Sequence, residues 1–84
     1  GGTYHDGESA TAIVQSTVAG LARLYQVTRT GTVSLVAILP VFPGVTERVT
    51  ASLGSTVGTS TFLLQVTGTT GQIHAATCSY SLVP

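Results

Sequence analysis

Turn-forming residues recur along this 84-residue chain at intervals of about ten residues, a spacing typical of the short strands of a sandwich or barrel. The segments between them are rich in Val, Thr, Ile, Leu and Phe, whose side chains pack well on a pleated surface. The chain is therefore predicted to be all-β, a small antiparallel sandwich or barrel of about six strands. The turn marks are Gly20, Thr30-Gly31, Pro43-Gly44, Gly54, Gly58, Gly68 and Gly71.

Alternation of apolar and polar residues locates the later strands, because successive side chains of a strand point to opposite faces. Segments 45–53, 60–67 and 72–83 alternate broadly in this way, with Glu47 on the apolar face of the first and with Leu63 and Ile73 on the more polar faces of the other two. We expect half-buried antiparallel strands with one side facing water or a partner. The residues that share a face are Val45, Val49, Ala51 and Leu53, then Phe62, Leu64 and Val66, then His74, Ala76, Cys78, Tyr80 and Leu82.

Segment 9–19 fits two interpretations. A helix is possible, since apolar residues recur at helical spacing behind Ser9, which is a suitable capping residue. A strand suits the many β-branched side chains, whose restricted rotamers disfavour a helix. We expect a strand and keep the helix as the alternative. The β-branched residues are Thr11, Ile13, Val14, Thr17 and Val18.

The run "TVSLVAILPVF", residues 32–42, is apolar on both faces if it forms a strand. It follows Thr30-Gly31 and is predicted to form a hairpin with segment 21–29. One face would carry every second residue from Val33 to Val41, and the other would carry Ser34, Val36, Ile38 and Phe42. A domain of this size has one core, so the second face needs another cover. That cover is either the N-terminal segment, if it is helical, or another copy of the protein.

Charge is scarce in this chain. Three arginines and three acidic residues make up 7% of the residues, where ordinary domains have about 25%. The net charge is zero and gives no protection against association. We therefore expect a structural, self-assembling subunit of a virion coat, a capsid decoration or a surface filament, located in a virion, outside the cell or at the cell surface. Its partners would be other copies of itself and, in some assemblies, a second structural protein.

Residues 1–8 are polar and glycine-rich and lack apolar periodicity. We expect a flexible arm, or a first turn, ahead of a single β-domain at residues 9–84. An extended arm of this length reaches up to about 28 Å, enough to lie across a neighbouring subunit. Tyr4 is predicted to anchor the arm there, with Asp6 or Glu8 pairing with an arginine of another copy.

Arg23, Tyr25 and Arg29 share one parity of their segment. Guanidinium groups beside an aromatic ring can stack on nucleic-acid bases or on a sugar. Three arginines without any lysine, however, give few contacts to phosphates. Arginine and tyrosine are also enriched at protein–protein interfaces. We assign these residues to such an interface, together with Val36, Ile38 and Phe42, and expect no nucleic-acid partner.

No motif for catalysis, a cofactor or a metal stands out. His5, Asp6 and Glu8 have ligand side chains, but a polar arm provides no preformed scaffold for a metal. The chain has no G-x-S-x-G sequence and no glycine-rich phosphate loop ahead of a helix. We expect no enzymatic activity, no cofactor and no metal. The alternative function is a secreted β-sandwich binding module, for example for carbohydrate, with Tyr4, Tyr25 or Tyr80 as a stacking platform.

No membrane span is expected either. The longest uncharged apolar stretch, residues 33–45, contains Pro40 and Pro43. It is also shorter than the about 20 residues that a spanning helix needs.

Overall fold

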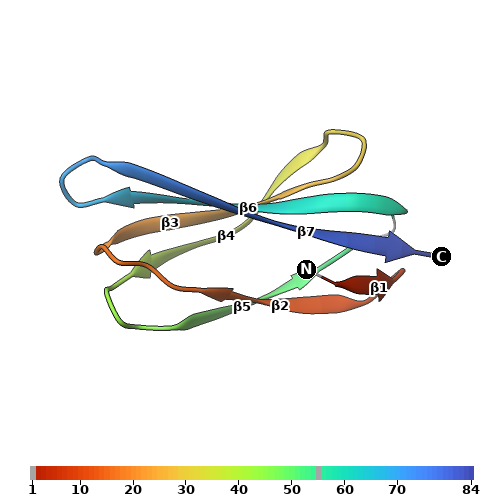
Figure 1. The fold of residues 1–84 in the computed structure, drawn as a ribbon, viewed down its shortest axis with the longest axis horizontal. Coiled ribbons are helices and arrows are strands. Elements are labelled where there is room, and N and C mark those ends of the chain that lie inside the picture. The colour runs from red at the N-terminus through yellow and green to blue at the C-terminus, as the bar shows by residue number, and fades with distance from the viewer. Residues whose placement is uncertain (1, 55) are drawn as a thin grey trace.

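Seven strands make up the protein, as shown by a computed structural model that describes residues 2–54 and 56–84 (Figure 1). The described residues contain no helix. The strands are β1 (Thr3–His5), β2 (Ser9–Val14), β3 (Gly20–Val27), β4 (Val33–Val41), β5 (Glu47–Ser52), β6 (Gly58–Gly68) and β7 (Ile73–Val83).

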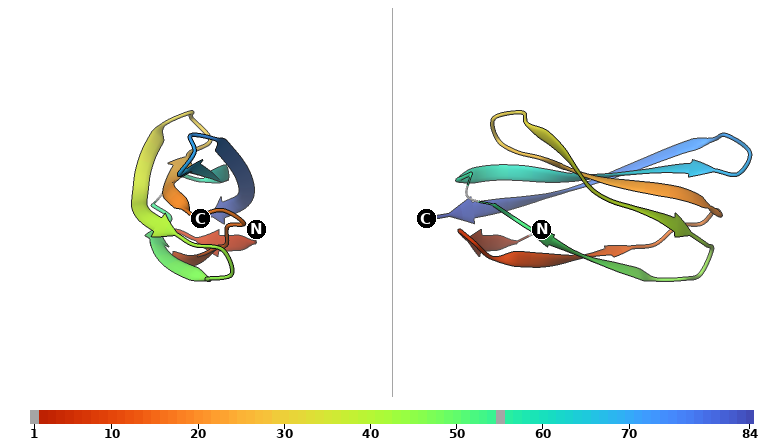
Figure 2. Two further views of the ribbon diagram at one scale, coloured as in Figure 1. Left: turned by 90° about the vertical axis from the view of Figure 1, so that its left-hand side faces the viewer. Right: turned by 180° about the vertical axis from the view of Figure 1, so that it is seen from behind.

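The strands form two sheets that pack as a sandwich. The larger sheet has the order β1-β7-β6-β3-β4, and the smaller one pairs β2 with β5. The chain crosses between the sheets four times, and the end-on view in Figure 2 shows both sheets curving around a narrow interior. The predicted all-β sandwich is confirmed, with seven strands instead of about six. The barrel alternative is wrong, because the described strands do not close on themselves.

Two parts of the N-terminal region differ in how well they were predicted. The expected strand in segment 9–19 is confirmed at Ser9–Val14, which pairs antiparallel with β5 at all six positions, and the helical alternative is wrong. Strand β1 was not predicted. It pairs in parallel with the end of β7, so the larger sheet is mixed. How mobile residues 1–8 are in solution stays a prediction.

The core follows the predicted alternation in β5, in β6 and at the end of β7, where Tyr80 and Leu82 are buried, whereas residues 73–79 of β7 are all exposed. Ala51 and Leu53 are buried on one face of β5, and Val66 is buried on the matching face of β6. Glu47 lies on the inward parity of β5 and is half-buried at the strand end. Two clusters of buried residues result: Val14, Ala22, Val41 and Val66 at one end, and Leu53, Tyr80 and Leu82 at the other.

Strand β4 departs from simple alternation. The hairpin with β3 is present, but the register shifts between Leu24 and Tyr25, so that Ala37 pairs with the first and Leu35 with the second. Val36 is the extra residue of this β-bulge. A bulge adds one residue to the strand, so the side chains beyond it point to the opposite face from that expected by simple alternation. The expected faces of β4 are therefore wrong for its first half, because Val33 and Leu35 lie on the outer face with Ile38.

Candidate functional site: the outer sheet face and the open flank

The outer face of the larger sheet can be mapped from the register of its strands. Buried Ala22 and Leu24 point inward from β3, so the residues between them and after them point outward. Each outward residue of β3 has a partner on β4 and another on β6, which in turn pairs with β7. The four rows across β4, β3, β6 and β7 are Pro40-Leu21-Thr67-Ile73, Ile38-Arg23-Gln65-Ala75, Leu35-Tyr25-Leu63-Thr77 and Val33-Val27-Thr61-Ser79.

This outer face changes in character from β4 to β7. At the β4 side it is apolar and exposed, with Val33 at 60%, Leu35 at 51% and Ile38 at 52% of their full exposure. Toward β7 the rows end mostly in small and hydroxyl side chains such as Thr77 and Ser79. Among these described rows no charged side chain occurs apart from arginine in the second row. The apolar part, formed by outward residues of β4 and β3, is called here the β4 face.

The β4 face contains part of the interface predicted from the sequence. Ile38 lies in its second row. Phe42 follows β4 and is also exposed, at 52%, where it begins the Pro43-Gly44 turn. Val36 is half-buried at the bulge. The N-terminal segment does not cover this face, because β2 belongs to the other sheet, so one of the two covers considered from the sequence is excluded.

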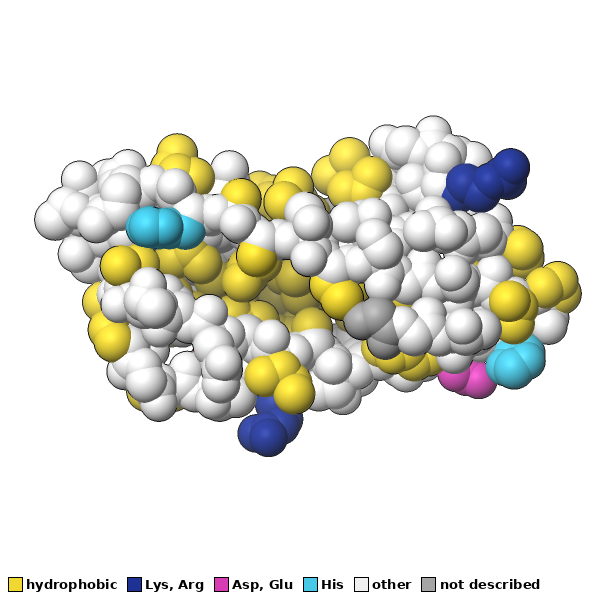
Figure 3. All heavy atoms as spheres, in the orientation of Figure 1, with side chains coloured by type: hydrophobic (Ala, Val, Ile, Leu, Met, Phe, Trp, Pro, Cys, Tyr) yellow, Lys and Arg dark blue, Asp and Glu magenta, His cyan; other side chains and the backbone are white. Residues whose placement is uncertain are grey.

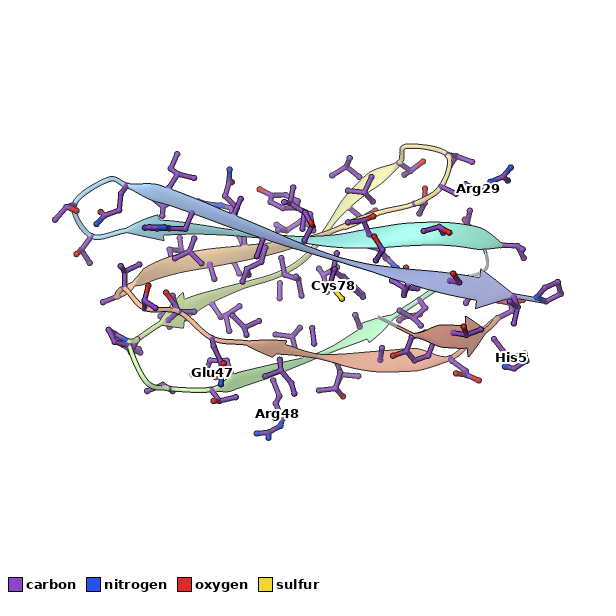
Figure 4. The ribbon with its side chains drawn as sticks, in the orientation of Figure 1. His5, Arg29, Glu47, Arg48 and Cys78 are labelled. Atoms are coloured by element: carbon purple, nitrogen blue, oxygen red, sulfur yellow. The ribbon has the colours of Figure 1, made fainter. Side chains whose placement is uncertain are left out.

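The predicted Arg-Tyr-Arg group is divided by the fold. Arg23 and Tyr25 lie on the outer face of β3, both half-buried. Arg29 lies beyond the end of β3, in the turn to β4, and its aliphatic stem packs over Gly58. Figure 4 shows Arg29 beside this turn and Arg48 pointing away from β5 on the opposite side of the molecule. The arginines therefore do not gather into one basic patch.

Tyr4 lies within its own chain's core in this structure. Its ring contacts Tyr80 edge-on, with ring centroids 6.1 Å apart, and it packs against the cluster around Leu82. Asp6 and Glu8 are exposed in the turn after β1. The Glu8 carboxylate lies 3.4 Å from His5 Nδ1. Tyr4 therefore packs against the core of its own chain. The pairing of Asp6 or Glu8 with an arginine of another copy stays a prediction.

A cavity of about 310 Å³ opens at the flank between β2 and β7. Figure 3 shows it as an apolar recess, and Figure 4 shows the Cys78 sulfur directed into the same gap. Phe62 and Leu64 form part of its lining, together with small residues of the two flanking strands. Ala10 and Ala12 belong to β2, and Ala76 and Cys78 belong to β7. This cavity is not visible in the sequence, because it arises where short side chains of two distant strands face each other.

The edge of β7 beside the cavity is largely unpaired. β1 covers only Ser81–Val83, and no other described strand pairs with that side of β7. The Ser81 N–H donates to the Gly2 carbonyl at 2.9 Å, so the backbone of Ser81 faces the edge. Alternate residues of a strand direct their N–H and C=O groups to the same side. Ile73, Ala75, Thr77 and Ser79 therefore present theirs to the open flank, and the open edge is defined here by these four residues.

The tyrosines considered as a stacking platform do not share one surface. Tyr25 lies on the outer face, whereas Tyr80 is 4% exposed and its hydroxyl accepts a hydrogen bond of 2.6 Å from the Gln26 amide. Among the described residues no group of three His, Cys, Asp or Glu side chains is placed to hold a metal ion. In the same part of the chain there is no helix long and apolar enough to cross a membrane.

Comparison with known proteins gives no relative for this fold and these surfaces. No known protein family, no curated protein and no solved structure matches the chain.

Proposed function

We propose that this protein is a self-assembling structural subunit of a larger ordered protein assembly, such as a virion coat, a capsid decoration or a surface filament. The observation that supports the proposal is the β4 face, on which Val33, Leu35 and Ile38 are each at least half exposed. Soluble monomers rarely expose contiguous apolar patches, and such a patch usually marks a site of interaction with another molecule.

The chemistry of the β4 face favours another copy as the partner. Arg23 supplies the one charge in the described rows, so the face offers little for recognition of a charged ligand. Burying a half-exposed Val, Leu or Ile side chain contributes about 1 kcal/mol. Several such side chains, with Tyr25 beside them, supply the apolar centre that protein–protein interfaces require.

The expected partners and location follow from this role and remain part of the proposal. Other copies of the chain are the main partner, with a second structural protein in some assemblies and no nucleic acid. Separation of Arg23, Arg29 and Arg48 on different parts of the molecule supports the last point, because phosphate binding needs clustered cations. The proposed location is a virion or the cell surface, and no catalytic role is proposed.

Light scattering coupled to size-exclusion chromatography tests the proposal. The chain at micromolar concentration should elute as assemblies larger than a monomer, and Ile38→Lys should weaken them by about 100-fold or more, because it places an unpaired ammonium in an apolar contact. Ile38 lies outside the core, so circular dichroism should show the β-fold retained. Ile13→Lys is the matched control, since Ile13 is 63% exposed on the smaller sheet. A wild-type monomer at high concentration would contradict the proposal.

A secreted binding module is the second candidate, and the cavity between β2 and β7 favours it. Its lining includes the aromatic residues Tyr4, Phe62 and Tyr80. Cavities of this size can hold a small ligand. This candidate requires a soluble monomer whose melting temperature rises with added ligand, and carbohydrates are the first class to test.

A further inference from the structure

The larger sheet ends at β4 on one side and, beyond the three residues that β1 covers, at β7 on the other, and these two edges differ in their capacity to pair. β4 has a bulge at Val36 and a proline at position 40, and both features discourage pairing with another strand. β7 has neither. Its pairing with β6 shows no register shift, and the segment from Ile73 to Ser79 contains no proline and no Asp, Glu, Lys or Arg. Strand pairing between copies is therefore available at β7 and discouraged at β4.

We propose that two copies of this protein pair through the open edge of β7, antiparallel to each other, so that their larger sheets become continuous. The proposal rests on the self-assembly proposed above and adds a second contact, distinct from the β4 face. The partner is a second copy because the edge is complementary to itself. It is uncharged, it presents both donors and acceptors, and a two-fold axis makes two identical strands antiparallel.

The bounds of the open edge determine the register. Ile73 is the first residue of β7, and Ser81 is the first residue covered by β1. Pairing Ile73 with Ser79 of the second copy, and Ala75 with its Thr77, uses all four edge residues of both copies. Shifting the register by two residues in either direction leaves at least one of them unpaired or directs it against β1. The favoured register therefore places Ala76 on the two-fold axis.

The side chains near that axis allow the close approach. Residues that face each other at a position without ladder hydrogen bonds have Cα atoms about 4.5 Å apart, the closest spacing in an antiparallel pair. Ala76 occupies this position in the favoured register, and its methyl group needs little room. Inward-facing Ala76 and Cys78 of the second copy then lie beside the mouth of the cavity, which both strands border. The contact thus covers apolar lining as well as backbone groups.

Two contacts on different surfaces have a consequence for the assembly. A two-fold contact alone closes after two copies. The β4 face lies at the opposite side of the sheet from the open edge, so each copy can use both at once. Repeated in alternation, the two contacts generate an extended assembly.

Proline substitution at the edge provides the first test. Thr77→Pro removes an N–H group that points to the open flank, and it leaves the hydrogen bonds between β7 and β6 intact. Because the contact is two-fold, one hydrogen bond is lost from each of the two copies. The dissociation constant of the edge contact should rise by about 30-fold or more. Thr77→Ala is the control, because it removes the side chain and keeps the N–H, and it should assemble as the wild type does. Equal assembly of Thr77→Pro and the wild type would overturn the inference.

Cross-linking provides a second test that does not depend on the proline variant folding. In a Cys78→Ser background, Ala76→Cys places one thiol on the predicted axis, within the Cα separation of 4.4–6.8 Å that disulfides adopt. Mild oxidation at micromolar concentration should convert most of this variant to a covalent dimer. Ser79→Cys in the same background is the control, because its nearest partner in this register is residue 73 of the second copy. Absence of the Ala76→Cys cross-link, or equal cross-linking at position 79, would overturn the inference.

The two proposals fail in different ways. If Ile38→Lys abolishes assembly while Thr77→Pro and the cross-linking variants show no effect, the edge contact is wrong and the β4 face stands. If Ile38→Lys has no effect while Ala76→Cys cross-links and Thr77→Pro gives monomers, the edge contact stands and the β4 face is wrong. A chain that is monomeric with no cross-link at position 76 overturns both, and an extended strand of another protein would then be the occupant of the flank to test.

Discussion

The two sides of the larger sheet present opposite combinations of face and edge. At β4 the outer face is apolar and exposed, while the edge has a bulge at Val36 and a proline at position 40. At β7 the outer face ends in side chains such as Thr77 and Ser79, while the edge is regular and unpaired over most of its length. One side is suited to contact through side chains and the other through backbone hydrogen bonds.

This difference bears on how an uncharged β-protein avoids uncontrolled association. An apolar strand with a regular open edge can aggregate both by burying its side chains and by pairing its backbone with another strand. Here they are separated by the width of the sheet. Strand β4 has the apolar residues but an interrupted edge, and β7 has the open edge but an outer face of mainly small and hydroxyl residues. Specific assembly is then compatible with a surface that has few charges.

Removing the interruption from β4 should break this separation and have the largest effect. Deleting Val36 and changing Pro40→Val restores a regular strand with the same outward residues, now with an open edge. We expect the double variant to associate about 100-fold more tightly than the wild type, because apolar and backbone contacts then act together. Light scattering against concentration measures the change, and electron microscopy shows whether fibres form.

Each single change serves as a control for that experiment. Deletion of Val36 alone keeps the proline, and Pro40→Val alone keeps the bulge, so each should have a smaller effect than the pair. A double variant that associates no more tightly than the wild type would show that the β4 edge is not what limits pairing.

Removing residues 1–8 should lengthen the open edge of β7 and destabilise the fold. The truncation uncovers Ser81–Val83 and exposes Tyr80, which now contacts the Tyr4 ring. We expect a loss of about 3 kcal/mol in the free energy of unfolding, from lost apolar burial and the aromatic contact. Urea denaturation followed by circular dichroism measures this loss.

The matched control changes the exposed turn without disturbing β1. Asp6→Asn with Glu8→Gln should alter the free energy of unfolding by less than about 0.5 kcal/mol, as is usual for surface changes. If truncation has as little effect as this control, residues 1–8 act as a mobile arm and not as part of the sheet.

The sequence allowed the strands and their inward faces to be predicted where alternation is regular. Phe62, Leu64 and Val66 share one parity, with Thr61, Gln65 and Thr67 on the other, and the same pattern identifies the buried side of β5. Such alternation reflects a strand with one face on the core, so it is visible without knowledge of its neighbours. The same reasoning identified Ile38 as a residue that needs a cover outside the core.

The remaining features depend on pairing between distant segments. The bulge at Val36 has no compositional mark, because valine is equally suitable in a regular strand. β1 has only three residues, and its position is determined by the end of β7. The open flank arises from the absence of a neighbour beside β7, which the residues of β7 alone do not reveal. These features depend on strand register and topology. Both are determined by contacts between residues far apart in the chain, which the local pattern of residues does not show.

Tyr80→Phe tests a hydrogen bond that links β7 to β3. The Tyr80 hydroxyl accepts a hydrogen bond from Gln26 of β3, which ties β7 to the centre of the sheet. Without this hydroxyl, the half-buried Gln26 amide keeps only longer contacts, at 3.5 Å, to the Ser52 and Leu53 carbonyl groups. We therefore expect a loss of about 1 kcal/mol in the free energy of unfolding. Tyr25→Phe is the control on the outer face and should change stability by about 0.5 kcal/mol or less. Equal effects of the two changes would show that the bond to Gln26 adds nothing to the stability of the β7 side.

The smallest expected effect is on the reactivity of Cys78, which reports on the open flank directly. Its side chain is exposed and its sulfur lies at the mouth of the cavity beside the β7 edge. Alkylation by iodoacetamide requires access to this sulfur. If copies pair through β7, the rate at a concentration that favours assembly should be several-fold lower than in the Thr77→Pro variant under the same conditions. Ile38→Lys should keep the slow rate, because it leaves the edge contact intact. Identical rates in all three proteins would show that nothing covers the flank, and the β7 edge would then differ from β4 in structure but not in use.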